Sequence, residues 1–294
     1  MKRVLALLAV CGIAVAALYV AQRRPHRDAV GPDAILAAAA DFQRDLTRAP
    51  MRWTRIPDSA EIRIGNQLAA LVIAGEPHGM ALAPSVGSDV SVVGQRLAAH
   101  AHRKLPYRFH VVANPDLINA FALPGGHVFV GLGMLRQMTS EDELAFVLGH
   151  EIEHVDHYHA AERVQVEAQL KRLDLDAIAG LAQLPLGLWQ QGYSKDQEME
   201  ADREGLRLAA TAGYSAQGAL NLLDRLEALQ RAHATRATTP VDELSHVAVA
   251  GLEGYFASHP PLEDRLAQVR AVIAADSLDT AQPLRPLEVS SSPR

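Results

Sequence analysis

The segment of residues 139–154 constrains the fold and the chemistry of this chain more than any other. Ser140 is followed three residues later by a glutamate, the spacing of a capping box, so the sequence predicts a helix that begins there. His150 and His154 lie about 40° apart on one face of that helix, and both imidazoles can therefore reach one ion. Glu151 lies about 100° further round, where its carboxylate can take a proton from water at the ion without binding the ion itself.

The alternative interpretation of this segment is a core helix whose two histidines only make hydrogen bonds. Most of the helix is apolar, so its histidines are not expected to face open water. His157 and His159 follow closely, and we interpret both as residues that support the site or lie at the surface, not as ligands. Short motifs of this kind also occur by chance. The metal interpretation therefore depends on whether the rest of the chain offers a third ligand.

A second predicted helix offers that third ligand. Ser194 and Gln197 form another capping box, which predicts a helix over residues 194–210. Glu198 and Asp202 share one face of it, above a stripe of small residues that would let this helix approach another one closely. Glu198 could bind the ion, and Asp202 could orient a ligand histidine through its free ring nitrogen. The alternative is a solvated acidic face, because other acidic residues lie nearby.

The hydrophobic pattern predicts a mostly helical α+β domain with a small antiparallel sheet. Helical spacing is followed by three short apolar runs that turn signals separate, and helical patterns then return up to about residue 275. This order of elements is typical of an α+β fold and not of a doubly wound sheet. We expect helices over 32–48, 59–74 and 89–100, and strands over 108–113, 119–123 and 127–130.

Both ends of the chain are predicted to lie outside this domain, which we expect over residues 30–276. Residues 1–24 contain a long uncharged apolar run flanked by basic residues. This run exceeds a typical signal-peptide core of about 7–15 residues and just reaches the length that crosses a bilayer. We therefore predict a signal anchor, with a cleaved signal peptide as the alternative. Residues 277–294 end in a Pro- and Ser-rich stretch without periodicity and are predicted to be a disordered tail.

The composition excludes several classes of protein. The chain has 28 Lys and Arg against 34 Asp and Glu, so it lacks the basic excess expected for nucleic-acid binding. Its hydrophobic fraction of 49% is too high for a disordered chain and too low for a protein with many membrane spans. A single cysteine excludes a disulfide framework and any metal site built from several cysteines.

Three separated motifs together resemble the M48 zinc metallopeptidases. They are His-Glu-Ile-Glu-His at 150–154, the Glu198 to Asp202 spacing, and Asn-Ala-Phe-Ala-Leu-Pro-Gly-Gly-His-Val-Phe-Val at 119–130. This family includes Ste24-like and Oma1-like peptidases and bacterial periplasmic quality-control peptidases. The resemblance covers about residues 89–275, well over half of the chain. It implies a zincin fold of the gluzincin type, in which an edge strand of the sheet borders the active-site cleft.

The resemblance also implies roles for individual residues. It implies one Zn²⁺ per chain held by His150, His154 and Glu198, with Glu151 as the general base and Asp202 as the residue that orients a ligand. It also implies an edge strand that holds an extended peptide by main-chain hydrogen bonds. The residues of this strand are Gly125, Gly126, His127, Val128, Phe129 and Val130.

A further element, His259-Pro260 followed by Arg265, is similar to an H-P-x-x-x-x-R element of the family. His259 would donate to the oxyanion of the reaction, or would occupy the open zinc position in a latent state. The alternative is that His259 lies at the start of a helix and has only a packing role. Arg265 would either hold this element in place or pair with an acidic residue. Tyr193 and Tyr255 are other candidate oxyanion donors, which the sequence does not rank.

We therefore expect a zinc endopeptidase that acts on unfolded or misassembled proteins of the bacterial cell envelope. It would be anchored in the inner membrane facing the periplasm, or periplasmic after signal cleavage. Its expected partners are a protein or peptide substrate, the membrane through residues 1–24, and an unidentified envelope protein. The alternatives are a latent or chaperone-like quality-control factor with a blocked zinc site, or another zinc hydrolase such as a deacylase. The apolar stretch 177–189 is too short to cross a bilayer and is interpreted as a buried helix or lid.

Overall fold

The structure is a computed structural model that describes residues 56–80, 84–170, 193–236, 255 and 259–287. All of these residues belong to the unit Ile56–Arg294. The predicted terminal apolar segment, the predicted helix at 32–48 and the apolar stretch at 177–189 lie outside the described residues. In the described part, none of the helices combines the length and the apolar character needed to cross a membrane.

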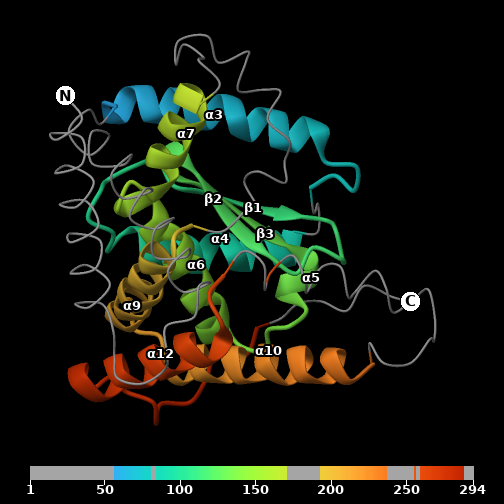
Figure 1. Cartoon of the computed structure of the whole chain (residues 1–294), viewed down its shortest axis with the longest axis vertical. Helices are drawn as coiled ribbons and strands as arrows, with labels where there is room; N and C mark the ends of the chain where they lie inside the picture. The colour runs from blue at the N-terminus through green and yellow to red at the C-terminus, as the bar shows by residue number, and fades with distance from the viewer. Residues whose placement is uncertain (1–55, 81–83, 171–192, 237–254, 256–258, 288–294) are drawn as a thin grey trace, which may run out of the picture. The chain divides into compact units, whose positions relative to one another are not determined.

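The described part of the chain is mostly helical, with one small sheet, so the predicted α+β class is confirmed (Figure 1). The helices are α3 (Asp58–Gly75), α4 (Pro84–Ala98), α5 (Leu132–Leu135), α6 (Glu141–Asp156), α7 (His159–Leu170), α9 (Lys195–Thr211), α10 (Gln217–Arg236) and α12 (Leu262–Asp276). The strands are β1 (Arg108–Val112), β2 (Ala120–Leu123) and β3 (His127–Gly131), and the short turn η1 (Pro124–Gly126) joins the last two.

The sheet differs from the predicted one in its strand order. Its order is β1-β3-β2, with β3 parallel to β1 and antiparallel to β2. The prediction of a purely antiparallel sheet is therefore wrong, and so is the prediction that residues 125–130 form an edge strand. β2 and β3 do form the expected hairpin, but β3 also pairs with β1 on its other side. Turn signals report only local chain reversal and do not specify which strand a hairpin places in the centre.

Both faces of the sheet are covered, which explains why β2 and β3 are buried along their whole length. Alternate side chains point to opposite faces of a strand, so each strand contributes to two cores. The smaller core lies against α3 and contains Phe121, Leu123 and Phe129. The larger core, which includes residues of α4, α6, α9 and α10, contains Ala120, Ala122, Val128 and Val130.

α6 and α9 cross with their backbones in direct contact at two glycines. A Cβ atom on Gly149 would lie 2.6 Å from the carbonyl oxygen of Gly205, and one on Gly205 would lie 2.5 Å from the amide nitrogen of His150. Real Cβ contacts are not that short, so no larger residue fits at either position without moving a helix. The predicted stripe of small residues on α9 is thus confirmed at this crossing, which brings the acidic face of α9 onto the histidine face of α6.

The two predicted capping boxes differ in the structure. At α9, Ser194 and Gln197 cap each other reciprocally, as predicted. At α6, the Ser140 side chain accepts from the Glu143 amide at 3.2 Å. The Glu143 carboxylate instead accepts from the amide of Thr139 and pairs with Arg225 of α10. The helix therefore begins where the sequence predicts it. The Glu143 carboxylate, however, binds Arg225 of α10 and does not complete the capping box.

Residues 277–287, here called the C-terminal strap, pack against the start of α6. The Arg285 carbonyl accepts from the Glu141 amide at 2.8 Å, and the Arg285 amide donates to the Asp142 carboxylate at 2.7 Å. The Leu287 amide donates to the Thr139 carbonyl at 3.2 Å. The prediction of disorder is therefore wrong for these residues, because their backbone groups find partners far away in the sequence. Residues 288–294 lie outside the described residues.

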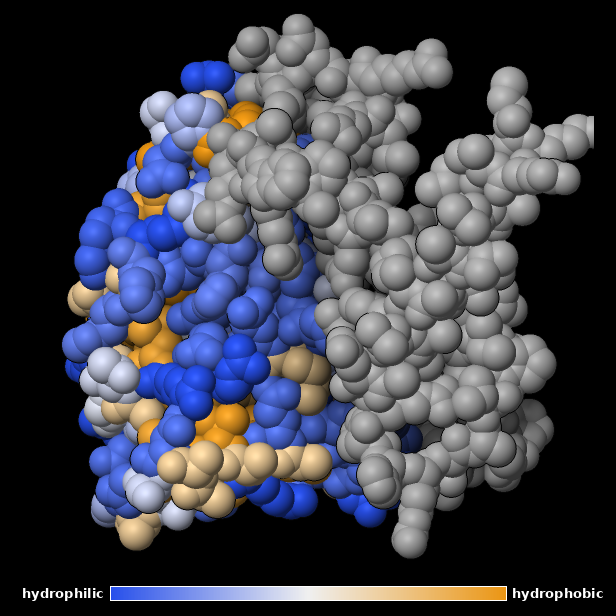
Figure 2. All heavy atoms as spheres, turned by 60° about the vertical axis from the view of Figure 1, so that its left-hand side comes forward, coloured by the Kyte–Doolittle hydropathy of each residue, from blue (hydrophilic) through white to orange (hydrophobic). Residues whose placement is uncertain are grey.

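Hydrophilic residues dominate the described surface on the face that Figure 2 shows, with apolar residues scattered among them. The large apolar side chains that are exposed in the described part include Leu71 and Ile73 on α3 and Val92 on α4. Scattered apolar side chains are common at the surface of soluble domains and by themselves indicate no binding function.

Candidate metal centre

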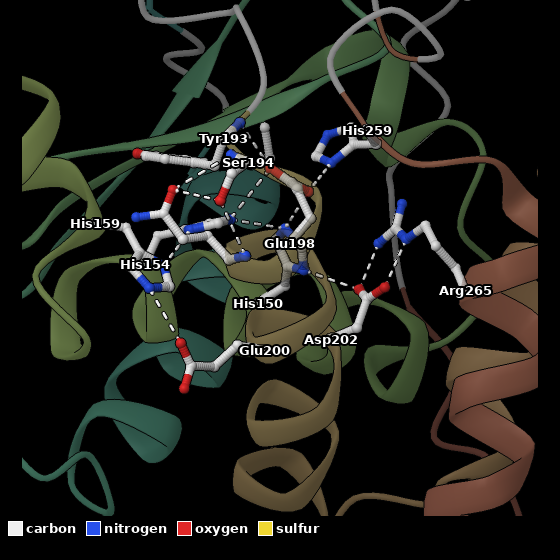
Figure 3. Close-up of polar contacts among 12 residues, drawn as sticks. His150, His154, His159, Tyr193, Ser194, Glu198, Glu200, Asp202, His259 and Arg265 are labelled. Carbon is white, nitrogen blue, oxygen red and sulfur yellow. Dashed lines mark hydrogen bonds and ion pairs between the residues drawn. The ribbon is translucent and has the colours of Figure 1, made fainter. Parts of the chain in front are cut away.

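Three side chains from two helices converge beside the α6–α9 crossing (Figure 3). The Nε2 atoms of His150 and His154 on α6 lie 3.0 Å apart. The Glu198 carboxylate on α9 lies 3.4 Å from His150 Nε2 through Oε2 and 3.7 Å from His154 Nε2 through Oε1. The structure thus brings together the three residues that the sequence singles out as ligands, and they form a group that could hold a metal ion.

The donor set of this group fits a divalent cation such as zinc. Ligand atoms about 2.0–2.1 Å from one ion in tetrahedral geometry lie ~3.4 Å apart, close to the separations found here. The ligand atoms lie within 4.8 Å of one another. All three side chains are buried, and Glu198 is 0% exposed. A buried carboxylate facing two imidazole nitrogens is costly unless a cation or hydrogen bonds neutralise it, so the site is suited to a positive charge.

Asp202 and Arg265 fix the orientation of His150 from behind. Asp202 Oδ1 lies 2.9 Å from His150 Nδ1, and Arg265 donates to both oxygens of the same carboxylate, through Nη2 at 2.6 Å and Nε at 2.7 Å. Burial alone would raise the pKa of Asp202, but the Arg265 guanidinium outweighs it and lowers that pKa to about 2. Burial would also lower the pKa of His150, but Asp202 and Glu198 raise it to about 10. In the chain without a metal, these carboxylates therefore favour a positive charge at His150.

We expect Arg265→Met to lower the free energy of unfolding by about 3–5 kcal/mol, because it leaves the Asp202 carboxylate buried without its cation. Both side chains are almost fully buried, with Arg265 at 3% exposure. The measurement is denaturant unfolding in the presence of a chelator, so that metal loss does not contribute. Lys195→Met is the control, since Lys195 forms an exposed ion pair with Asp264 between the same two helices. A loss as small as the control's, about 0–1 kcal/mol, would contradict the expectation.

Glu151 lies between the two histidines in sequence and is buried with them. Its Oε2 atom has no hydrogen-bond partner among the described residues. Burial, partly opposed by His150, raises the pKa of Glu151 to about 7. A buried carboxylate with a free oxygen and a raised pKa has the properties of a group that exchanges protons with a bound molecule near neutral pH.

His259 and Tyr193 also contact the ligand group. His259 Nδ1 lies 2.6 Å from Glu198 Oε2. The Tyr193 ring stacks on His154 with its centroid 3.8 Å away, and its amide donates to Glu198 Oε1 at 3.1 Å. The Tyr255 hydroxyl accepts from Arg265 instead. Of the two tyrosines that the sequence leaves unranked, Tyr193 thus contacts both His154 and Glu198, and the Tyr255 hydroxyl is bound to Arg265.

The residues predicted to hold substrate lie at the turn and in the centre of the sheet. Gly125 (φ +74°) and Gly126 (φ +100°) adopt left-handed conformations that favour glycine. The Gly125 amide donates to the buried carboxylate of Glu61 on α3. Because β3 pairs on both sides, the strand that lies against α6 with an unpaired edge in the described part is β2. The sequence predicts this strand at 119–123 but not its edge position, because no local signal distinguishes the edge strand from the central one.

Two further residues near the ligands escaped sequence reasoning or received no definite role. His159 touches His154, and Glu200 on α9 touches His159 (Figure 3). The sequence leaves open whether His159 supports the site or lies at the surface. Glu200 is one of the acidic residues near Glu198 that suggest a solvated acidic face. No local signal indicates this role for Glu200, because a residue two positions after Glu198 lies about 200° further round the helix and not on the face shared with Asp202.

A histidine pair on one helix, a glutamate from a second helix and a buried glutamate beside them form the arrangement typical of metallopeptidases, here on a mostly helical α+β domain. The comparison with known families agrees: the model of peptidase family M48 matches residues 84–273, well over half of the chain. The chain belongs to peptidase family M48.

Individual relatives match shorter parts of the chain. A beta-barrel assembly-enhancing protease of Escherichia coli K12 is 30% identical over 227 residues, covering 71% of this chain and 42% of the relative. The corresponding protease of Yersinia pestis is 31% identical over 161 residues, covering 49% of this chain and 33% of the relative. The mitochondrial metalloendopeptidase OMA1 of Bos taurus is 38% identical over 141 residues, covering 42% and 27%. The chain thus spans less than half the length of these relatives.

Proposed function

We propose that this chain is a zinc-dependent endopeptidase that hydrolyses peptide bonds in unfolded or misassembled cell-envelope proteins. The observation that carries the proposal is the buried convergence of His150, His154 and Glu198, together with a buried Glu151 oxygen that has no hydrogen-bond partner among the described residues. Nitrogen and carboxylate donors in this combination suit Zn²⁺, and three protein ligands leave a position open for chemistry.

The residues of the site have separate tasks in this proposal. A zinc ion held by the three ligands would supply Lewis-acid polarisation of the substrate carbonyl and would acidify water. Glu151 takes the proton of the attacking water at its carboxylate and then delivers it to the leaving amine. Its burial supports this task, because a pKa raised to about 7 lets the group both accept and release a proton near neutral pH. Asp202 and Arg265 hold the His150 ring in place.

An extended substrate would pair with the edge of β2. This part of the proposal is supported by the position of β2, which in the described part of the chain is an edge strand that lies against α6, the helix that carries His150 and His154. Pairing through main-chain hydrogen bonds selects an extended backbone and not a particular side chain. This preference fits substrates that are unfolded, and it disfavours a small-molecule hydrolase such as a deacylase.

The cell envelope as the place of action is part of the same proposal. It is supported by the name of the bacterial relatives, which are called beta-barrel assembly-enhancing proteases. The apolar run in residues 1–24 adds support, since it is suited to an inner-membrane signal anchor or to a cleaved signal peptide. An unidentified envelope protein is the proposed partner besides the substrate, and the acidic net charge of -6 offers no case for nucleic acid.

One contact favours a latent or chaperone-like factor as the second candidate. His259 Nδ1 lies only 2.6 Å from Glu198 Oε2, so this histidine occupies space beside the ligands in the present conformation. A chain that stays in this state would bind unfolded proteins without cleaving them. His259→Ala distinguishes the two candidates, because it would release cleavage from a latent site. If His259 instead helps to bind the oxyanion, the same change would reduce cleavage.

Removing the metal tests the proposal directly. We expect the purified full chain to contain about one zinc ion and to cleave casein, an unfolded protein. A strong chelator should abolish cleavage and lower the melting temperature, because metal bound only to the folded state stabilises it. Adding Zn²⁺ back should restore both properties. Cleavage that persists after complete metal removal would refute the proposed function.

A further inference from the structure

His154 has a hydrogen-bond partner that differs in kind from that of His150. The Nδ1 atom of His150 faces a carboxylate, that of Asp202, at 2.9 Å. The Nδ1 atom of His154 instead faces the Nδ1 atom of a third histidine, His159, at 3.0 Å. The Nε2 atom of His159 in turn lies 3.3 Å from Oε2 of Glu200 (Figure 3). His154 and His159 are both buried, whereas the Glu200 side chain is 36% exposed.

The direction of these hydrogen bonds follows from the geometry of the ligand group. His154 Nε2 faces the other two ligands and needs its lone pair to bind a cation, so the ring proton of His154 lies on Nδ1. This Nδ1–H can only donate, so His159 Nδ1 must accept. The proton of His159 then lies on Nε2 and is donated to Glu200. Each donor in this series of hydrogen bonds thus meets one acceptor. Glu200 determines which tautomer His159 adopts.

We propose that His159 is a positioning residue for the metal centre: it accepts the Nδ1–H of His154 and, with its tautomer fixed by Glu200, orients the His154 lone pair toward the ion. The inference rests on the proposed metal site. It gives three carboxylates of α9 separate places at the site: Glu198 faces the ion, Asp202 accepts from His150, and Glu200 accepts from His159. Partners of this kind fix the ring orientation of a ligand and raise its basicity.

The turn between α6 and α7 is built to place His159 there. α6 ends at Asp156, and Tyr158 adopts φ +64°, a left-handed conformation that costs a bulky residue energy. Arg103 holds this conformation in place. Its guanidinium carbon lies 3.8 Å from the centroid of the Tyr158 ring, and its Nη1 donates to the Val155 carbonyl at 2.7 Å. The reversal at Tyr158 brings His159, the first residue of α7, back over His154.

The same turn provides a matched control. His157 lies on the other side of Tyr158 and also approaches Glu200, at 3.7 Å. Its Nε2 pairs with Glu153 at 3.1 Å, its side chain is 38% exposed, and no contact joins it to the ligand atoms of the described group. A change at His157 therefore disturbs the turn and the Glu200 environment without removing the partner of His154.

The experiment compares three variants of the full chain for metal affinity and for the spectrum of bound Co²⁺. His159→Phe keeps an aromatic ring but removes the acceptor, and we expect Zn²⁺ affinity, measured by competition with a chelator, to fall by about 10–100-fold. The visible absorption of the Co²⁺-loaded chain should shift, because the ligand ring reorients. His159→Asn places an acceptor oxygen where Nδ1 lies and should recover most of the affinity. His157→Phe should leave both readouts as in the parent.

Several results would overturn the inference. Equal Zn²⁺ affinity in His159→Phe and the parent would show that His154 needs no such partner. Equal loss in His159→Phe and His159→Asn, or a loss as large in His157→Phe, would assign the effect to packing of the turn. The proposed function fails differently: a parent chain that binds Zn²⁺ but cleaves nothing would refute the peptidase and still allow these affinities to be compared.

Discussion

Glu151→Gln is expected to lower the rate of peptide cleavage by about 10²–10⁴-fold, the usual contribution of a general base, while the zinc content stays unchanged. Glutamine fills nearly the same volume but cannot accept the proton of the attacking water. The side chain is not among the converging ligand atoms, so the metal should remain bound. The measurements are the initial rate of casein cleavage and the zinc content of the same protein samples.

Glu153→Gln is the matched control for this variant. Glu153 is also buried on α6, only two residues further along, but it pairs with His157 and not with the ligand group. We expect cleavage by Glu153→Gln to remain within a few-fold of the parent. If Glu151→Gln cleaved casein as fast as this control, Glu151 would not be the base, and the proposed mechanism would fail even with zinc in place.

Glu198→Ala is expected to abolish zinc binding at the concentrations used for purification, and cleavage with it. Zinc needs three protein ligands at such a site, and alanine leaves only the two imidazoles. The loss should exceed the roughly 10–100-fold that removal of a hydrogen-bonding partner costs a metal site. The measurement is the metal content of the purified chain, followed by titration with Zn²⁺ against a chelator.

The control for the ligand variant is Glu204→Ala, on the same helix. Glu204 is partly exposed, pairs with Arg203 and Arg207, and lies away from the ligand group. This variant should bind zinc as the parent does. A Glu198→Ala protein that retains one tightly bound zinc ion would show that another residue supplies the third ligand, and the assignment of Glu198 would then be wrong.

Sequence reasoning predicted the parts of this molecule that depend on nearby residues. Capping residues and helical spacing are local properties, so the start of α6, the start of α9 and the shared faces of their side chains follow from the sequence alone. The convergence of His150, His154 and Glu198 then follows from one more requirement, a close crossing of the two helices. The stripe of small residues containing Gly205 met that requirement.

Features that depend on distant partners were not predictable in the same way. The central position of β3 follows from its pairing with β1, which local hydrophobic patterns do not specify. The role of Glu200 depends on the reversal at Tyr158, a left-handed residue with no glycine to announce it. The strap lacks periodicity because it is held by hydrogen bonds to distant residues and by single leucines, Leu278 and Leu287, that pack against the core, and not by a regular apolar face.

The strap also has a consequence for when the start of the histidine helix is completed during synthesis. Arg285 follows Asp142 by 143 residues, so the first turn of the histidine helix acquires these bonds only after the residues up to Arg285 have been synthesised. Contacts of such long sequence separation form late in folding because a long loop must close first. A nascent chain that has not yet reached Leu287 therefore lacks the finished helix start. The start of the histidine helix is therefore among the last parts of the described domain to be completed.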